Sequence, residues 1–214
     1  MSVTGNTHRA FSVTFAIGGA VALTHFQISE VNPLIAAPVL LMAARYGALM
    51  PDVDHHWNSV SEKNLPNRMI NVFIHLTGGT HRSWQTHSWD IFAVFIAIVW
   101  FFPREVLAPL GIPTISVLYM LLYGVMLGWG SHLFADMLTP AGVRLFCWSK
   151  FKLRLVPKWA LFATNSRWEE MCFSFMRVVN TLAGVAYVGW CVYTLGIAQW
   201  VMNNIRSFIV LIGL

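Results

Sequence analysis

Histidines and carboxylates recur at short spacings in separate stretches of the sequence, a pattern typical of metal ligands. The stretch "SHLFAD" places His132 and Asp136 four residues apart. On a helix, side chains at positions i and i+4 share one face, so these two can converge on one ion. Neutral imidazoles and carboxylates are ligands for zinc, manganese or iron. A carboxylate near a helix C-terminus is otherwise unfavourable, which favours metal binding over simple helix capping.

The stretch "PDVDHH" supplies two carboxylates and two imidazoles, namely Asp52, Asp54, His55 and His56. Pro51 favours an extended backbone at Met50, which ends the preceding helix. Two carboxylates two residues apart in a non-helical backbone can bridge two ions, or bind one ion through alternate faces. We rank the carboxylates above the histidines as ligands. A polar turn, in which Asp is ordinary, is the alternative interpretation.

The stretch "GGTHRSWQTHS" places His81 and His87 six residues apart, just before a strongly apolar run. On a continuous helix this spacing points the two rings apart. Either Gly78 and Gly79 begin a loop that carries His81, or the two histidines bind different ions. We expect His87 in the first turn of the next helix, where the dipole favours phosphate, and Arg82 to hold a phosphate oxygen. Two interfacial histidines without a ligand are the alternative.

Two further candidates, His8 in "TGNTHRAF" and Glu169 in "TNSRWEE", are weak when taken alone. The joint pattern is stronger, because five separate stretches then supply imidazoles and carboxylates. Such a cluster offsets its mutual repulsion and desolvation most simply by binding cations. We interpret His25 and His75 as structural.

The composition indicates an integral membrane protein. Hydrophobic residues make up 57% of the 214 residues and charged residues only 11%, whereas a soluble domain usually has about 25% charged residues. The mean hydropathy is +0.60. We therefore expect an all-α membrane bundle with one domain over residues 1–214. A soluble protein with an unusually apolar core is the alternative.

Five apolar stretches approach the ~20 residues that a helix needs to cross a bilayer: residues 10–26, 33–50, 84–102, 114–137 and 178–200. The tail "SFIVLIGL" is too short to cross. If the N-terminus lies inside, all but two of the fourteen Lys and Arg residues face the cytoplasm, the exceptions being Arg104 and Arg206. The positive-inside rule selects this orientation, which gathers the candidate ligands on the cytoplasmic side. The net charge of +5 reflects this asymmetry, and we expect no nucleic-acid partner.

The order of the motifs resembles the YdjM-like family of inner-membrane-associated proteins, which are proposed to be metal-dependent hydrolases. The matching segments are "NTHRAF", "YGALMPDVDHH", "THRSWQTHS" and "GWGSHLFADMLTPAGVRLF". The family pattern has, in the same order, an early His, LLPDxDH, HRxxTHS and SHxxxDxxTxxG. The resemblance implies a multi-pass protein of the bacterial inner membrane. It also implies a set of ligands or acid–base groups: His8, Asp52, Asp54, His81, His87, His132, Asp136 and Glu169.

More distantly, the sequence resembles the superfamily of zinc-dependent phospholipase C and P1 nuclease. Those helical enzymes hold three zinc ions and use an HxxxD pair like His132 and Asp136. Their first ligand is a mature N-terminal amine, which an unprocessed chain lacks. Their HxxxE pair is also missing, because Asn165 stands four residues before Glu169. We therefore expect two or three divalent ions, zinc before manganese or iron.

These features predict a membrane-bound hydrolase that cleaves a phosphoester or phosphoanhydride of a lipid with a metal-bound hydroxide. Arg82 would steady the phosphoryl charge, and Asp54 or Glu169 would act as the base. The sequence has no HExxH motif, which argues against a zincin-type metalloprotease. It also has no Gly-rich phosphate loop and no GxSxG motif. The lipid and the oligomeric state stay open.

Two other functions are compatible with the sequence. The first is a non-catalytic membrane protein that binds an acidic regulatory partner through the basic loop Arg144–Lys158; the family label suggests contact with a DNA-damage repressor. The second is a proton or ion transporter. A transporter would need ionisable groups at several depths, whereas here they crowd one end.

Overall fold

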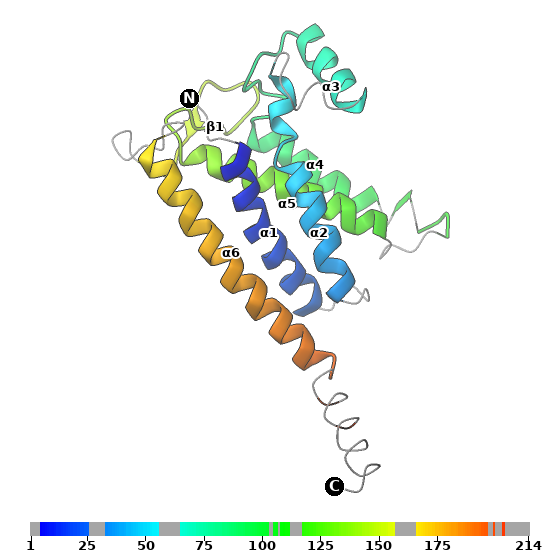
Figure 1. The fold of residues 1–214 in the computed structure, drawn as a ribbon. Coiled ribbons are helices and arrows are strands. Elements are labelled where there is room, and N and C mark those ends of the chain that lie inside the picture. Colours follow the sequence, from blue (N-terminus) through cyan, green and yellow to red (C-terminus); the bar gives the residue numbers. More distant parts are fainter. Residues whose placement is uncertain are drawn as a thin grey trace, which may run out of the picture.

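The long apolar stretches of the sequence become helices (Figure 1). The computed structural model describes residues 5–25, 33–55, 65–102, 105, 106, 108–111, 117–156, 166–196, 199 and 203. Within them lie the helices α1 (Gly5–His25), α2 (Pro33–Gly47), α3 (Leu65–Leu76), α4 (Trp89–Phe102), α5 (Val117–Met137) and α6 (Arg167–Thr194). A 3-10 helix, η1 (Pro51–Asp54), follows α2. One antiparallel hairpin joins β1 (Val143–Arg144) to β2 (Lys152–Leu153). The predicted all-α class is confirmed.

Each of the five predicted apolar stretches contains a helix, but the ends differ from those expected. α6 begins at Arg167 instead of residue 178. Ser166 caps it, because its Oγ accepts a hydrogen bond from the backbone N–H of Glu169 at 3.2 Å. A Ser followed three residues later by Glu is a helix-start signal, and it extends the helix upstream of the apolar run. The C-terminal tail "SFIVLIGL" lies outside the described residues.

Two helical segments of the described chain are long and apolar enough to cross a membrane, Leu118–Met137 and Arg167–Thr194. α2 has 15 residues and α4 has 14, fewer than the ~20 that a straight crossing needs. The prediction of five crossings therefore stays a prediction.

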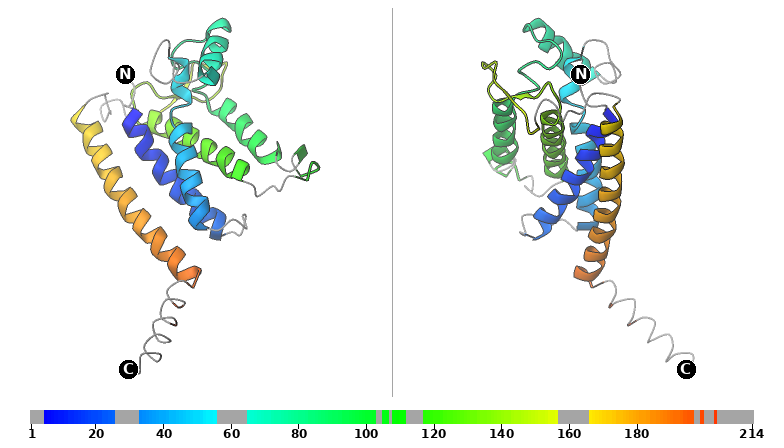
Figure 2. Two further views of the ribbon diagram at one scale, coloured as in Figure 1. Left: turned by 45° about the vertical axis from the view of Figure 1, so that its right-hand side comes forward. Right: turned by 90° about the vertical axis from the view of Figure 1, so that its left-hand side faces the viewer.

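The helices pack around α1, which lies between α2 and α6, while α5 crosses α1 and α2 obliquely and carries α4 on its other side (Figures 1 and 2). One core cluster joins α1, α2, α5 and α6 through buried side chains that include Leu23, Leu40, Met120 and Cys191. A second cluster joins α4 to α5 and the hairpin through Phe92, Leu133 and Val143. The end of α5 is thereby held from both sides.

Glycines bring α2 and α5 into direct backbone contact. A Cβ atom at Gly128 would overlap the carbonyl oxygen of Ala44, and one at Gly47 would overlap that of Val125. Gly124 is similarly close to Ala43. Small residues four apart on a helix allow this close approach, and the approach fixes α5 one turn before the candidate ligand pair begins.

The polar stretch between residues 51 and 83 contains a helix, α3, that the sequence analysis did not predict. Five of its large exposed apolar side chains form one stripe, made of Leu65, Met69, Val72, Phe73 and Leu76. The opposite side is tied down, because Asn71 donates to the carbonyl of Val53 and Tyr46 donates to Asn67. An amphipathic helix with an exposed apolar stripe is typical of one lying at a membrane interface.

The contact between α2 and α5 predicts that two glycine substitutions differ in their effect on stability. We expect Gly128→Val to destabilise the protein by about 1–3 kcal/mol or more, because the added methyl groups overlap the α2 backbone. Gly189→Val is the matched control, since a Cβ there contacts nothing within 4 Å. Thermal unfolding in detergent measures both. Equal midpoints for the two variants would show that the helices do not depend on this contact.

Candidate metal centre

His132 is fixed by the contact between α5 and α2. It lies one turn beyond Gly128 and is fully buried. Its Nδ1 donates to the carbonyl oxygen of Ala48 at 2.7 Å, and a carbonyl can only accept, so this nitrogen carries the proton. When the ring is neutral, it therefore presents the lone pair of Nε2 to the interior. Holding one ring nitrogen on a carbonyl is how proteins orient metal-binding histidines.

His87 is oriented in the same way by Asp54. It lies in the turn before α4, and its Nδ1 is 3.1 Å from Asp54 Oδ2. A carboxylate accepts, so Nδ1 again carries the proton and Nε2 presents its lone pair. The two outward-facing nitrogens, His87 Nε2 and His132 Nε2, are 3.2 Å apart. Two lone pairs at this distance repel each other unless a cation lies between them.

Asp136 supplies the third donor atom. Its Oδ2 lies 3.5 Å from His87 Nε2 and 3.6 Å from His132 Nε2, and it has no hydrogen-bond partner among the described residues although it is buried. Ligand atoms of a tetrahedral zinc site, with bonds of 2.0–2.1 Å, are about 3.3 Å apart. The three separations match that spacing. A proton would satisfy one pair of these atoms, whereas a divalent ion would satisfy all three.

A second group of donors adjoins the first. His8, Asp52 and His132 each place one ligand atom within 4.8 Å of the others. The His8 ring stacks on that of His132 with centroids 3.8 Å apart. Both ring nitrogens of His8 are buried and lack a hydrogen-bond partner among the described residues, which is unfavourable by about 1–3 kcal/mol per group. A cation at this position would relieve that penalty.

The two groups share one nitrogen, which limits how many ions they can hold. His132 Nε2 belongs to both, and its Nδ1 is already bound to Ala48. A single lone pair binds a single ion. The described residues therefore support one ion that draws ligands from both groups, or one ion on His132 and a weaker second position on His8 and Asp52. The predicted two or three ions stay a prediction.

Asp54 organises the loop that carries His87. It is fully buried, and its two oxygens accept hydrogen bonds from four donors: His81 Nδ1, His87 Nδ1, the backbone N–H of Ser83 and the hydroxyl of Thr86. Burial opposes ionisation, but the hydrogen bonds from His81, His87 and Thr86 outweigh it and hold the pKa of Asp54 well below its usual value. In this arrangement Asp54 orients ligands. Its predicted roles as a ligand and a base are not tested by this geometry.

Arg82 lies against the donor triad with unused hydrogen-bonding capacity. Its Nη2 donates to Asp136 Oδ1 at 2.6 Å, which leaves Asp136 Oδ2 for an ion. Its Nε and Nη1 are buried and have no partner among the described residues. The backbone of Arg82 has a φ of 61°, a left-handed conformation that is uncommon outside glycine and clusters at functional sites.

Three predicted ligands lie outside both donor groups, namely Asp54, His81 and Glu169. His81 is 37% exposed, and its Nδ1 is 3.1 Å from Asp54 Oδ1. Glu169, in the first turn of α6, is buried and accepts a hydrogen bond from Thr7 at 3.0 Å. Thr7 precedes His8, so this bond ties α6 to the end of α1 that carries a candidate ligand. His55 lies beside His81 with ring centroids 4.7 Å apart, and His56 lies outside the described residues.

The sequence of this chain matches the profile of the YdjM inner membrane protein family over residues 3–205. The chain belongs to this family. No curated protein and no solved structure matches it. The family resemblance inferred from the motif order is thus confirmed, and it places the chain among membrane proteins. The more distant similarity to zinc-dependent phospholipase C and P1 nuclease is not confirmed.

The local structure of this YdjM family member corrects two expectations. Met50 is helical, with φ −59° and ψ −41°, and not extended, because Pro51 occupies the first position of η1, where a proline is favoured. Asp52 and Asp54 therefore leave a 3-10 turn toward different partners, one near His132 and the other near His87.

The second correction concerns His87. It does not lie in the first turn of α4, which begins at Trp89. The first turn instead holds Asp90, whose carboxylate compensates the helix dipole and accepts the backbone N–H of Cys147 at 2.8 Å. The loop alternative for "GGTHRSWQTHS" is the correct one, with Gly78 at a φ of 78°. Thr86, which donates to Asp54, was not among the predicted site residues. Its signals in the sequence were its place beside His87 and the Thr of the HRxxTHS pattern.

The geometry predicts different effects for two Asp-to-Asn substitutions. We expect the purified protein to hold a divalent ion and Asp136→Asn to abolish its binding. Asp54→Asn should weaken affinity about 10–100-fold, the usual effect of losing an orienting partner. Elemental analysis and competition with a chelator measure both, with His25→Gln at the far end of α1 as the control. If Asp54→Asn loses the ion completely, Asp54 is itself a ligand.

Proposed function

We propose that this YdjM family member is a membrane-bound, metal-dependent hydrolase that cleaves a phosphoester or phosphoanhydride of a lipid. The observation that carries the proposal is the buried triad of His87, His132 and Asp136, with the partly unsatisfied guanidinium of Arg82 beside it. A divalent ion bound there would polarise a phosphoryl oxygen. It would also lower the pKa of a bound water to near neutrality.

Arg82 gives the site its preference for phosphate. Its Nη2 is held by Asp136, which orients the planar guanidinium, and Nε and Nη1 stay available. These N–H groups are charged donors of the kind that bind phosphoryl oxygens, and they lie on different edges of the guanidinium. In a phosphoryl transfer such a donor would stabilise the charge that develops on a phosphoryl oxygen.

Further positive charge surrounds the approach to the site. Arg144 and Lys152 are paired across the β1–β2 hairpin, and the backbone N–H of Arg144 donates to the carbonyl of His87. Burial and the charges of Arg144, Arg82 and Arg154 lower the pKa of Lys152. These cations therefore lie close enough to interact, and such a group attracts an anionic substrate.

His81 is the residue best placed for proton transfer. Asp54 holds its Nδ1, so Nε2 is the atom that accepts or donates a proton. The ring is partly exposed, unlike the fully buried ligands. Asp54 accepts four hydrogen bonds on its two oxygens. It is therefore a weaker base than a carboxylate without these donors would be. Glu169 remains a second candidate for this role.

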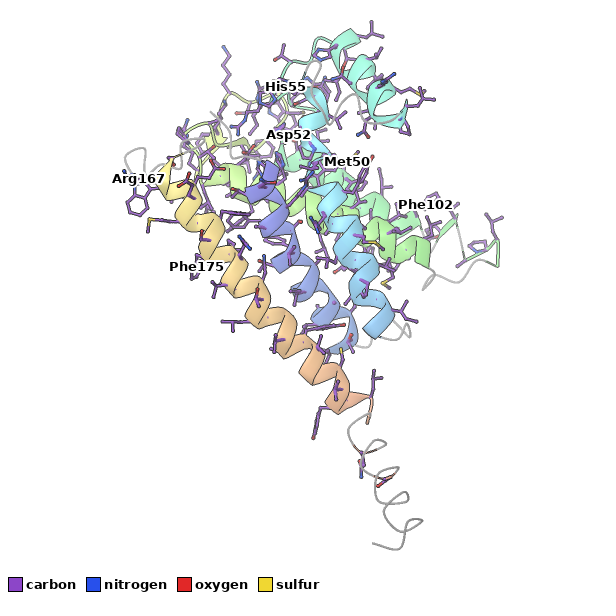
Figure 3. All side chains as sticks on the ribbon, viewed as in Figure 1. Met50, Asp52, His55, Phe102, Arg167 and Phe175 are labelled. Atoms are coloured by element: carbon purple, nitrogen blue, oxygen red, sulfur yellow. The ribbon has the colours of Figure 1, made fainter. Side chains whose placement is uncertain are left out.

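We further propose that the N-terminus and the metal centre face the cytoplasm. The elements that contribute donors all meet at one end of the bundle. Asp52 and His55 lie just beyond α2, at the same end as Arg167 at the start of α6 (Figure 3). That end carries most of the basic residues, as the positive-inside rule requires of a cytoplasmic face. An ion there is accessible to a headgroup whose acyl chains stay in hydrocarbon.

The hydrolase proposal predicts lipid-phosphate cleavage that depends on Arg82. Purified protein loaded with zinc or manganese should release phosphate from phosphatidate or a prenyl diphosphate in mixed micelles. Arg82→Lys should lower kcat/KM about 100-fold or more, because one ammonium cannot replace two fixed donors, while the metal content is retained. Arg167→Lys, exposed at the start of α6, is the control. No release from either substrate by fully metal-loaded protein would contradict the proposal.

A second candidate function, binding of an acidic regulatory protein, has one favourable observation. The β1–β2 hairpin and its flank expose the aromatic side chains of Phe146, Trp148 and Phe151 beside Lys150 and Lys152. Exposed aromatic residues next to cations are typical of interaction surfaces. Residues 157–165, which include the end of the predicted loop, lie outside the described residues.

This alternative predicts that partner capture and metal binding are lost through different substitutions. If the hairpin is a docking surface, Trp148→Ser with Lys150→Gln should abolish co-purification of an acidic protein, and Asp136→Asn should leave it intact. Quantitative pull-down from membranes measures both. Loss of capture in the Asp136 variant with capture retained in the hairpin variant would exclude this surface.

A further inference from the structure

Three arginines from three helices meet away from the metal centre. Arg9 of α1, Arg45 of α2 and Arg177 of α6 line one pocket of about 330 Å³. The other polar residues of its lining are uncharged, and no acidic residue is among the described residues that line it. Three guanidinium groups repel one another across a shared pocket unless an anion lies among them.

The three arginines have no counter-charge of their own. Within the described ranges of the chain, none of them forms an ion pair. The guanidinium of Arg177 lies 5.8 Å from the centroid of the Phe173 ring, a contact that orients it without neutralising it. Asn180 uses its amide to join the helices, by donating to Ala10 O and accepting from Thr14. The amide of Asn180 thus has its hydrogen-bond partners, whereas the charges of the three arginines are not neutralised.

An apolar strip on α6 adjoins this pocket. A neighbouring hollow of about 400 Å³ shares Arg177 and Thr181 with the first and adds Val178 and Leu182 of the same helix. On this side of α6 the side chains of Val178, Leu182 and Val185 are all exposed.

The pocket and the adjoining apolar strip together have the polarity of a phospholipid. Eight residues separate Arg177 from Val185, which is about 12 Å along a helix. One end is cationic and the other end is apolar. Arginine forks bind phosphate oxygens, and basic pockets between membrane helices bind anionic headgroups. A free phosphate would have no use for the apolar end, and the exposed apolar side chains of α6 suit contact with lipid.

We propose that this pocket binds an anionic phospholipid, with its phosphate among Arg9, Arg45 and Arg177 and an acyl chain along the exposed apolar strip of α6. The site contains none of the metal-centre side chains, so the inference goes beyond the proposed hydrolase and does not depend on it. The lipid bound here is a resident ligand that joins α6 to α1 and α2.

Native mass spectrometry of the detergent-purified protein, with added phosphatidylglycerol, phosphatidylcholine or glycerol phosphate, tests the proposal. We expect phosphatidylglycerol to bind at least about tenfold more tightly than either of the others and to raise the thermal midpoint. Binding should survive treatment with a chelator, which separates this site from the metal centre. Equal binding of phosphatidylcholine would overturn the proposal, and equal binding of glycerol phosphate would reduce the site to one for free phosphate.

Variants at the pocket and on the apolar strip test the two halves of the site. Arg45→Gln with Arg177→Gln should lower phosphatidylglycerol affinity at least tenfold, and Leu182→Asp should do the same by placing a charge where the acyl chain would lie. Both changes are at exposed positions. Arg167→Gln is the matched control and should bind as the unaltered protein does. Unchanged lipid affinity in the double arginine variant, with helical content and metal content intact, would overturn the assignment.

Discussion

The hydrogen bond from His132 Nδ1 to the carbonyl of Ala48 depends on how closely α5 approaches α2. Gly47, Gly124 and Gly128 remove the side chains that would hold the two backbones apart. Because the helices touch, an imidazole one turn further along α5 reaches a carbonyl at the end of α2. That bond fixes the tautomer of His132 and directs Nε2 toward His87 and Asp136. The rest of the metal centre is arranged around this nitrogen.

Asp54 plays the corresponding role on the other side of the centre. Its buried carboxylate gathers donors from His81, Ser83, Thr86 and His87, and so it shapes an irregular loop that has no helix to support it. Hydrogen bonds to a buried carboxylate compensate for its lost hydration. The result is a second imidazole with its proton fixed on Nδ1 and its Nε2 facing the first. Helix α5 and this loop thus direct their donor atoms toward a common point.

At the same end of the bundle, the candidate ligands for a cation and the side chains that could bind an anion lie next to one another. Donor atoms for a cation lie innermost, the partly unsatisfied guanidinium of Arg82 adjoins them, and the hairpin cations lie beside it. A second set of arginines lines a pocket formed by α1, α2 and α6. Membership of the YdjM inner membrane protein family is consistent with a protein that meets lipid on several faces. The structure thus keeps the buried candidate ion ligands apart from the arginines of this pocket.

The sequence by itself determined the helical class and the approximate place of five helices. The i, i+4 spacing of His132 and Asp136 was sufficient to predict their convergence, because helix geometry alone fixes it. It also determined the family, through the order of its motifs.

Other features were decided only by tertiary structure. Asp52 and Asp54 are equivalent in the sequence, but a 3-10 turn sends one toward His132 and the other toward the loop. The separation of His81 from the donor groups, the left-handed backbone of Arg82 and the partners of Thr86 depend on contacts between residues distant in the chain. Helix periodicity carries no information about such contacts, because irregular backbone follows whichever hydrogen bonds the surrounding helices leave available.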